Sequence, residues 1–401
     1  MSNKNSFPIV TLKRGREESL LRRHPWVFSG AVASVSGEVT AGATVLVRSA
    51  EGLQLGFGAW SPVSQIRIRM WGYGDSPAPD AALFRDRLRN AAALRSLVID
   101  ASVTDAYRVV FSEADGLPGL IVDRYADWLV CQFLSAGVEH WREAILDALR
   151  EEFPGLRLYE RSDEESRGKE GMEPRSGDLG DGQPDSAILI KENGMRLFVD
   201  VVTGHKTGLY LDQRDNRATL REFAAGKDVL NCFSYTGGFA VAALTGGAAS
   251  VLDCDASADA LALARENTAM CLHASAAYFQ EQGDVFSVLR SFRDARKTYD
   301  IIVLDPPKFA HTAAAVNKAA RGYKDINLLA FKLLRPGGLL FTFSCSGHIV
   351  PPLFRKIVAD AAVDAGVDAV VLREMTQSGD HPAALSVPES LYLKGLLCKK
   401  M

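Results

Sequence analysis

The stretch DVLNCFSYTGGFAVAAL, residues 228–244, decides the fold class. It begins with an apolar strand, continues through a turn that contains Gly237 and Gly238, and enters a helix. The same order of elements recurs after it. Strands are predicted at 228–232, 250–253, 301–304 and 339–343, with helices at 257–271 and 322–334 between them. Alternating strands and helices predict an α/β fold with a parallel sheet that is wound on both faces.

Ligands bind such sheets at the carboxyl ends of the strands, so the residues just after each strand are the first candidates. After the first strand, Gly237 and Gly238 let the backbone approach a ligand at a helix start, although a plain tight turn is the alternative. The G-x-G-x-x-G pattern is missing there, which disfavours a nicotinamide dinucleotide. Asp255 follows the second strand, where it can accept hydrogen bonds from a ribose or cap the next helix. A further strand, the third along the chain, precedes Gly283 and so lies between the strands at 250–253 and 301–304. Asp284 follows it, either near a bound adenine or in a surface turn.

The fourth strand is followed by Asp305-Pro306-Pro307-Lys308-Phe309. The two prolines fix φ at successive residues and remove two backbone donors. This predicts a stiff rim that presents carbonyl groups and Asp305 to a flat group bearing an amino substituent. Cys345 follows the fifth strand, at the same edge of the sheet and one strand away.

The sequence indicates three domains in the 401 residues, two of which precede the α/β domain. Residues 1–74 contain short strands separated by Gly and Ser and predict a small β-barrel. Residues 75–186 predict a small α+β domain that ends in an exposed loop, because 162–186 has hardly any apolar residues. Residues 187–401 form the α/β domain described above.

Composition excludes several classes of protein. Hydrophobic residues make up 47% and charged residues 24%, and no apolar run approaches the ~20 residues of a membrane span. The polar N-terminus has no signal core, and the six scattered cysteines show no metal-binding spacing, so we expect a cytoplasmic protein without a metal. Residues 1–72 hold nine Lys and Arg against four acids, and the net charge of the chain is −3. A basic module on an acidic body favours docking to a polyanion, although chance asymmetry explains the charges equally well.

Taken together, these residues resemble the class I methyltransferases, and more closely the RlmI-type cytosine-5 methyltransferases of large-subunit (23S) ribosomal RNA. The likeness covers nearly the whole chain. The segments that carry it are 112–125, 206–217, 231–239, 305–309 and 344–347. The resemblance implies a PUA barrel, a central domain, a Rossmann-like catalytic domain, S-adenosylmethionine as cofactor and ribosomal RNA as partner. The sequence leaves the oligomeric state open, and a homodimer is one option.

The resemblance also implies roles for individual residues. Gly237 and Gly238 would lie against the methionine end of the cofactor, Asp255 would bind its ribose, and Asp284 would lie near its adenine. The segment from Lys206 to Arg214 would help to close the site. The full set of expected cofactor residues is Lys206, Tyr210, Asp212, Arg214, Phe233, Tyr235, Thr236, Gly237, Gly238, Asp255, Asp284, Asp305 and Pro306. Cys232 and Cys254 depart from the larger or more polar residues expected there.

Cys345 and Asp305 are the expected catalytic residues. A thiolate that adds to carbon 6 of cytosine makes carbon 5 nucleophilic, and Asp305 would hydrogen-bond the cytosine amino group. Ordinary burial is the alternative for Cys345. A group of polar and aromatic residues is expected to contact RNA, and a solvated loop is the alternative for it. These residues are Lys308, Asn317, Lys318, Arg321, Tyr323 and Lys324. Two other functions stay open: methylation of a guanine nitrogen, which needs no cysteine, and a catalytically silent RNA-binding scaffold.

Overall fold

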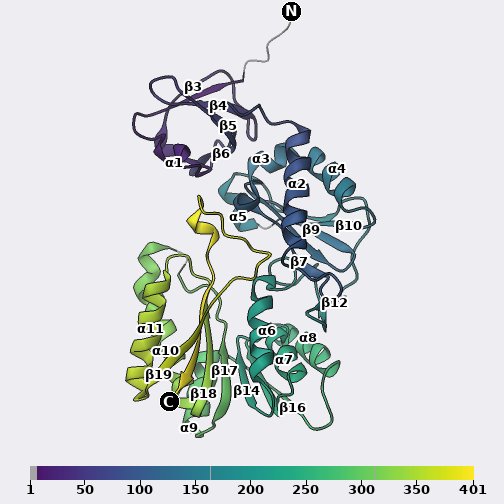
Figure 1. Cartoon of the computed structure of the whole chain (residues 1–401), viewed down its shortest axis with the longest axis vertical. Helices are drawn as coiled ribbons and strands as arrows, with labels where there is room; N and C mark the ends of the chain where they lie inside the picture. Colours follow the sequence, from purple (N-terminus) through teal and green to yellow (C-terminus); the bar gives the residue numbers. More distant parts are fainter. Residues whose placement is uncertain (1–6, 163, 311) are drawn as a thin grey trace, which may run out of the picture. The chain divides into compact units, whose positions relative to one another are not determined.

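The computed structural model describes residues 7–162, 164–310 and 312–401, whose contacts form two compact units (Figure 1). The first unit holds the chain up to residue 188 together with 201–208 and 379–390. The second unit holds 189–200, 209–378 and 391–401. We describe each unit by itself.

The first unit begins with a six-stranded sheet in the order β2-β6-β5-β4-β1-β3. Its strands are β1 (Ile9–Leu12), β2 (Trp26–Phe28), β3 (Val32–Ser36), β4 (Thr44–Arg48), β5 (Gln54–Trp60) and β6 (Ile66–Tyr73), with a short helix α1 (Glu18–Leu21). Along β6, Ile68 and Met70 are buried in the core, whereas Arg67 and Arg69 lie on the other face. Apolar and charged residues therefore alternate along β6 as they do in a strand with one buried face.

A second sheet of the first unit has the order β11-β10-β9-β8-β7. Its strands are β7 (Ala106–Phe111), β8 (Leu120–Tyr125), β9 (Trp128–Phe133), β10 (Arg157–Ser162) and β11 (Arg175–Asp178). The helices of this part are α2 (Ala81–Ser96), α3 (Ala136–His140), α4 (Arg142–Glu152) and α5 (Glu164–Lys169). Helices α2 and α4 pack together, and buried residues such as Phe84, Leu129 and Leu149 form one core with the strands.

The prediction that 162–186 is only an exposed loop is wrong for the part of it that the structure describes. This segment contains α5 and β11, and β11 pairs antiparallel with β10. The buried guanidinium of Arg167 donates to the Phe133 carbonyl at 2.8 Å and to Glu139 at 2.7 Å, and the buried Glu170 accepts from Ser61 and Arg69, each at 2.7 Å. Because paired charges anchor the segment in place of apolar residues, its composition gave no sign of order.

The second unit is built on a seven-stranded sheet in the order β16-β15-β14-β17-β18-β20-β19. The strands are β14 (Asp228–Cys232), β15 (Ser250–Asp255), β16 (Ala277–Gln282), β17 (Tyr299–Leu304), β18 (Leu334–Ser344), β19 (Ala369–Thr376) and β20 (Lys394–Lys400). The strands β14 to β18 run parallel, and β20 runs antiparallel to both β18 and β19. A two-stranded sheet of β12 (Ile188–Glu192) and β13 (Met195–Val199) precedes these strands along the chain.

Helices cover both faces of this sheet. They are α6 (Arg214–Phe223), α7 (Gly238–Thr245), α8 (Ala258–Ala269), α9 (Val285–Asp294), α10 (Val316–Leu333) and α11 (Pro351–Ala365). Along β17, Ile302 and Leu304 face a core with α9, α10 and α11, whereas Ile301 and Val303 face a second core with α6 and α7. Strands that are buried on both faces read as continuous apolar runs, and their alternation with helices is the pattern that predicts the α/β fold.

Candidate functional site

The carboxyl ends of β14, β15, β17 and β18 meet at one edge of the sheet in the second unit. Strand β14 lies between β15 and β17, with Cys232 opposite both Cys254 and Leu304. The chain moves outward in one direction from β14 to β16 and in the other direction from β17 onward, so the strand order reverses between β14 and β17. A ligand crevice is expected outside such a reversal.

The loop after β14 is held in an uncommon backbone conformation. Phe233 and Tyr235, which are not glycines, have φ of +59° and +47°, and Gly237 has φ of +78°. Positive φ at non-glycine residues costs of order 1–3 kcal/mol each and gathers at ligand sites. The carboxylate of Asp255 fixes this loop, because it accepts the backbone N–H of Tyr235 at 2.8 Å and that of Ser257 at 2.9 Å.

The helix cap near Asp255 is supplied by another residue. Ser257 is the N-cap of α8, and its hydroxyl accepts the N–H of Ala260 at 3.2 Å. Asp255 is half-buried and supports the loop after β14. Each carboxylate oxygen has a second lone pair, so Asp255 keeps acceptor capacity for a hydroxyl group.

Packing restricts side chains at both glycines, and the positive φ of Gly237 favours glycine there as well. A Cβ atom on Gly237 would lie 3.0 Å from the Cβ of Ala264 and 3.2 Å from an oxygen of Asp253. A Cβ atom on Gly238 would lie 3.1 Å from the Cδ of Arg217. Thr236 next to them is buried, and its carbonyl accepts the side-chain amide of Asn267 at 2.9 Å. A side chain at either position would therefore force its neighbours at the start of α7 to shift.

Asp253 lies beneath this loop and was not singled out from the sequence. It is fully buried in β15, where Asn231 and the hydroxyl of Tyr278 each donate to it at 2.8 Å. Burial raises the pKa of the Asp253 carboxyl to about 7. The sequence pattern places Asp253 in an apolar strand, and only the fold shows that two donors from neighbouring strands meet it.

The segment before α6 comes to the same strand ends. Its half-buried Tyr210 packs edge-on against Tyr235, with ring centroids 5.5 Å apart. Arg217 donates to the Tyr210 carbonyl at 3.0 Å and forms a buried, two-pronged ion pair with Glu192, with both contacts at 2.6 Å. Glu192 and Arg217 were not assigned a role from sequence, because Glu192 is separated from its partner along the chain.

Asp305, at the end of β17, is half-buried and accepts the side-chain amide of Gln213 at 2.9 Å. Burial and, to a lesser degree, the negative charge of Asp212 raise the pKa of Asp305 to about 7. Pro306 beside it is buried and Pro307 is exposed. A carboxyl group that titrates near neutral pH at a ligand edge is suited to proton exchange.

Cys345 directly follows β18, one strand from Asp305, and is half-buried. Burial is the main cause that raises the pKa of the Tyr210 phenol. Asp305, Tyr235 and Cys345 face it and add to the shift in that order. The structure thus brings Cys345, Asp305 and Tyr210 together. The next residue, Ser346, is buried and shares a 3.0 Å hydrogen bond with the hydroxyl of Tyr323, which fixes the turn after β18.

Several buried polar atoms near this edge have no hydrogen-bond partner among the described residues. They are Oδ1 of Asp212, Oδ1 of Asn231 and Oγ of Ser234. Buried polar groups are nearly always paired, so water or the polar groups of a ligand would satisfy these atoms. Together with the acceptor Asp255 and the tight turn at Gly237, they fit the hydroxyl and ammonium donors of S-adenosylmethionine. Ser234 and Asn231 are additions to the residues expected from sequence.

Two expected cofactor residues have other surroundings. Asp284 is exposed and caps α9, where it accepts the backbone N–H of Ser287 at 3.0 Å. Lys206 belongs to the segment 201–208 of the first unit, where it is exposed and has φ of +58°. The remaining expected residue, Arg214, starts α6, is buried and lies 3.1 Å from a carboxylate oxygen of Asp215.

The expected RNA contacts are divided by the structure. Lys308, Asn317, Lys318 and Arg321 are exposed, and Lys324 pairs with Asp364 at 2.7 Å. Tyr323 is completely buried, with its ring 4.6 Å from that of Phe309, so the expectation that it contacts RNA is wrong. A ring that is enclosed by core side chains has no face left for a base.

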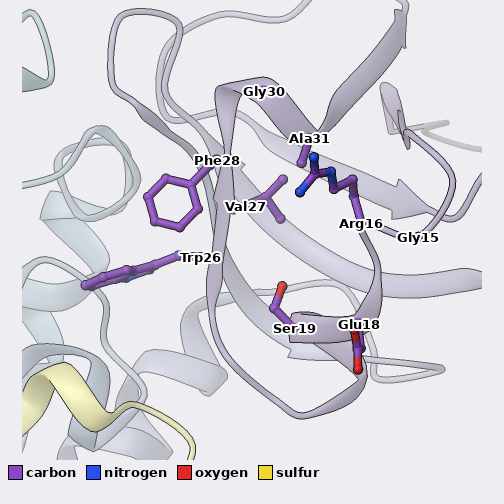
Figure 2. A pocket seen from close by; sticks show the side chains of 9 residues that line it. All are labelled: Gly15, Arg16, Glu18, Ser19, Trp26, Val27, Phe28, Gly30 and Ala31. Atoms are coloured by element: carbon purple, nitrogen blue, oxygen red, sulfur yellow. The ribbon is translucent and has the colours of Figure 1, made fainter.

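The N-terminal sheet of the first unit carries a separate hollow of about 370 Å³ (Figure 2). Trp26 and Phe28 extend from the same side of β2, as alternate residues of a strand do, and Arg16 and Glu18 also line the hollow. The ring of Phe28 is half exposed, whereas Arg69 on the same sheet is paired with Glu170.

No helix in the described part of the chain has the length and apolar character of a membrane span. The same residues contain no cluster of three metal-binding side chains.

Comparisons with known proteins agree with this geometry. Residues 171–378 match the family model of S-adenosylmethionine-dependent methyltransferases, and residues 10–72 match that of PUA-like domains. A relative from Shewanella denitrificans, called ribosomal RNA large subunit methyltransferase I, is 50% identical over 97% of this chain and 98% of its own length. A relative of the same name from Klebsiella pneumoniae is 48% identical over 98% of this chain and 99% of its own.

Solved structures share the fold. A candidate methyltransferase solved in complex with SAH has a TM-score of 0.84 at 24% identity, covering 98% of this chain and 99% of that chain. A candidate S-adenosylmethionine-dependent methyltransferase from Streptococcus mutans has a TM-score of 0.83, also at 24% identity, covering 97% of this chain and 100% of that chain. These similarities concern the fold alone.

Proposed function

Because the chain belongs to the family of the ribosomal RNA large subunit methyltransferases I, we propose that it methylates carbon 5 of a cytosine in large-subunit ribosomal RNA. The dependence on S-adenosylmethionine and the PUA-like domain follow from the family models. The choice of base rests on one observation: Cys345 and Asp305 end neighbouring strands at the edge where the cofactor residues lie.

Carbon 5 of cytosine needs activation before it can take a methyl group. The thiolate of Cys345 adds to carbon 6, so that an Sγ–C6 bond forms and the electron pair of the C5–C6 double bond moves to carbon 5 and the ring. Carbon 5 then forms its bond to the methyl carbon. Loss of the carbon 5 proton to a base and expulsion of the thiolate restore the aromatic ring. The bound cofactor would supply the methyl group from its sulfonium: the S–CH3 bond would break, and its electron pair would stay on sulfur as a neutral thioether.

Asp305 supports the addition step through its pKa of about 7. When sulfur adds to carbon 6, negative charge develops at nitrogen 3 of the base. A carboxyl group that is partly protonated at neutral pH gives a proton to nitrogen 3 and takes it back when the thiolate is expelled. Its second oxygen accepts a hydrogen bond from the neighbouring amino group. Gln213 orients the carboxyl group by donating to its Oδ1.

The cofactor residues hold the other reactant in place. Asp255 accepts hydroxyl groups of the ribose, and the turn at Gly237 lets the backbone approach the methionine part. The carboxylate of Asp212 and the carbonyl oxygen of the Asn231 side chain accept hydrogen bonds, because each has a buried oxygen left unpaired by the described residues. Asp284 lies near the adenine, with one oxygen engaged by its helix cap.

The test is methylation of large-subunit RNA taken from cells that lack this protein, followed by mass mapping of the products. We expect 5-methylcytosine with the unaltered chain and none with Cys345→Ala. Cys271→Ala is the matched control, because Cys271 is also half-buried but follows α8, and it should retain activity. Calorimetry with S-adenosylmethionine checks that each variant still binds the cofactor.

The same experiment separates the two other functions. Methylated guanine that persists in Cys345→Ala would show attack by a ring nitrogen and would overturn the proposal. No detectable heat with S-adenosylmethionine in the unaltered chain, and no methylated product, would indicate an RNA-binding scaffold. The glycine pair at 237–238, together with Asp255 and Asp305 at the strand ends, argues against a scaffold.

A further inference from the structure

Lys394 is a buried lysine at the end of the sheet that carries Cys345. Its side chain is 8% exposed as part of β20, where Lys394 stands opposite Ser344 in the antiparallel pairing with β18. Its Nζ donates a 2.7 Å hydrogen bond to the carbonyl oxygen of Ser346. Lys394 therefore contacts the residues on both sides of Cys345, one through the strand pairing and one through its ammonium group.

The charge of Lys394 is not neutralised by an acid. None of the carboxylates that the structure describes forms an ion pair with it, although a buried cation is costly unless it is paired. Burial lowers the pKa of Lys394 to about 8. The charged groups that face it are Cys345, which favours the ammonium form, and Lys308, which disfavours it. An ionised Cys345 is thus the anionic partner that this lysine lacks.

Other groups near Cys345 do not supply a comparable positive charge. Tyr210 and Tyr323 face it, and burial raises the pKa of both phenols, which keeps them neutral. Lys308 is exposed, so water and salt screen its charge. Lys394 combines a positive charge with burial, and burial strengthens the attraction between charges.

We propose that Lys394 is the positioning residue that holds Cys345 as a thiolate. The amine of Lys394 accepts the proton of the Cys345 thiol, which leaves a thiolate and an ammonium group side by side. The ammonium group keeps its hydrogen bond to Ser346 and so stays at the turn after β18. The inference rests on the proposed function, in which Cys345 is the nucleophile.

The test measures the ionisation of Cys345 without RNA or methyl transfer. The full chain is treated with iodoacetamide between about pH 6 and pH 9, and alkylation of the Cys345 peptide is followed by mass spectrometry. We expect Lys394→Met to slow alkylation roughly tenfold at pH 7 and to move its midpoint to higher pH, because one pKa unit is a tenfold change in thiolate. Lys394→Arg keeps the charge and should leave the midpoint no higher than in the unaltered chain.

The matched control is Lys400→Met on the same strand. Lys400 donates to the carbonyls of Phe331 and Leu334 at the other end of β20, and burial lowers its pKa as well. It should leave the alkylation of Cys345 unchanged. Thermal melting and binding of S-adenosylmethionine show whether each variant is folded.

The outcomes separate this inference from the proposed function. An unchanged midpoint in folded Lys394→Met would overturn the role of Lys394, while the methylation test of Cys345→Ala is unaffected by that result. If Lys394→Met does not fold, the arginine variant decides, since a raised midpoint despite its positive charge would refute the pairing. Persistent cytosine methylation by Cys345→Ala would instead refute the proposed function and leave the measured pairing intact.

Discussion

The side-chain amide of Gln213 donates a 2.9 Å hydrogen bond to Oδ1 of Asp305 and so ties the segment before α6 to the end of β17. The orientation of this amide is fixed in turn, because Asn216 donates to the Gln213 carbonyl oxygen at 2.6 Å. The amino group of Gln213 must therefore face the carboxyl group. A residue that lies far from Asp305 in the sequence therefore favours its charged form, against the larger effect of burial.

Replacement of Gln213 by leucine should shift the pH dependence of methylation. The hydrogen bond from Gln213 favours the charged form of Asp305, whose pKa is already raised by burial to about 7. Its removal raises this pKa further, so the carboxyl group stays protonated to higher pH. Since Asp305 acts as an acid, the falling, alkaline limb of the single-turnover rate should move to higher pH, with roughly a tenfold lower maximum rate from lost orientation.

Gln213→Glu provides a second test of the same relationship. A carboxylate at position 213 repels the charged form of Asp305 and should move the alkaline limb in the same direction. Binding of S-adenosylmethionine, measured by calorimetry, controls for a damaged site. An alkaline limb that stays in place in both variants would show that Asp305 does not titrate in the reaction.

Gly237→Ala should weaken cofactor binding as well as stability. Alanine at φ of +78° is strained by about 1–2 kcal/mol, and its Cβ would lie 3.0 Å from Ala264 and 3.2 Å from Asp253. The loop must shift to relieve these contacts, and we expect at least tenfold weaker binding of S-adenosylmethionine. Gly226→Ala is the matched control, because Gly226 has φ of +68° but open space around its Cβ position. It should lower the melting temperature without changing the affinity.

Asp253→Asn should change the way stability depends on pH. The folded pKa of Asp253 is raised to about 7, so the folded state holds a proton that the unfolded chain releases above its ordinary pKa of 3.8. The contribution of Asp253 to stability is therefore full in acid and is lost as the pH rises toward 7. Between about pH 5.5 and pH 8 this loss is roughly 2 kcal/mol. Asparagine does not titrate, so the variant should lose less stability over this interval.

Asp228→Asn is the control, because the pKa of Asp228 is shifted in the opposite direction to that of Asp253. Hydrogen bonds from Ser250 and Arg335 lower the pKa of Asp228, so its carboxylate is ionised in the folded and unfolded chain throughout this pH interval. The variant should be less stable by the same amount at both pH values. Melting temperatures at the two pH values check both expectations, and a parallel response of the two variants would contradict the buried, protonated state of Asp253.

The strand ends of the second unit were predictable because their signals are local. The strand Asp228–Cys232 has the predicted bounds, and Asp305 and Cys345 directly follow their strands as expected. Strand β15 runs two residues further than predicted, so that Asp255 is its last residue. Long-range partners were not predictable. Contacts that span at least 25 residues of sequence connect the site to Gln213, Glu192 and Lys394. No local sequence pattern indicates contacts of this kind.

The error at Tyr323 has a specific origin. The sequence predicts a helix that starts at Gly322, but α10 begins at Val316, and Gly322 lies within it against the ring of Phe309. The earlier start changes which residues share a helix face. Ala319, Tyr323, Ile326 and Ala330 then follow the helical period and point into the core. Glycine inside a helix is uncommon enough that its packing reason becomes visible only in three dimensions.

Tyr323→Phe and Arg321→Ala should therefore affect different properties of the protein. Phenylalanine keeps the buried ring of residue 323 but removes the hydroxyl that shares a 3.0 Å hydrogen bond with Ser346, beside Cys345. We expect about 1 kcal/mol lower stability and slower methylation, with unchanged RNA affinity. Arg321 is exposed on the same helix, so its loss should weaken RNA binding. The slope of log affinity against log salt concentration should become less steep by about one, the contribution of one phosphate contact. Binding titrations over a range of salt concentrations, combined with melting curves, separate the two effects, and weaker RNA binding by Tyr323→Phe at every salt concentration would mean that the ring turns outward when RNA is bound.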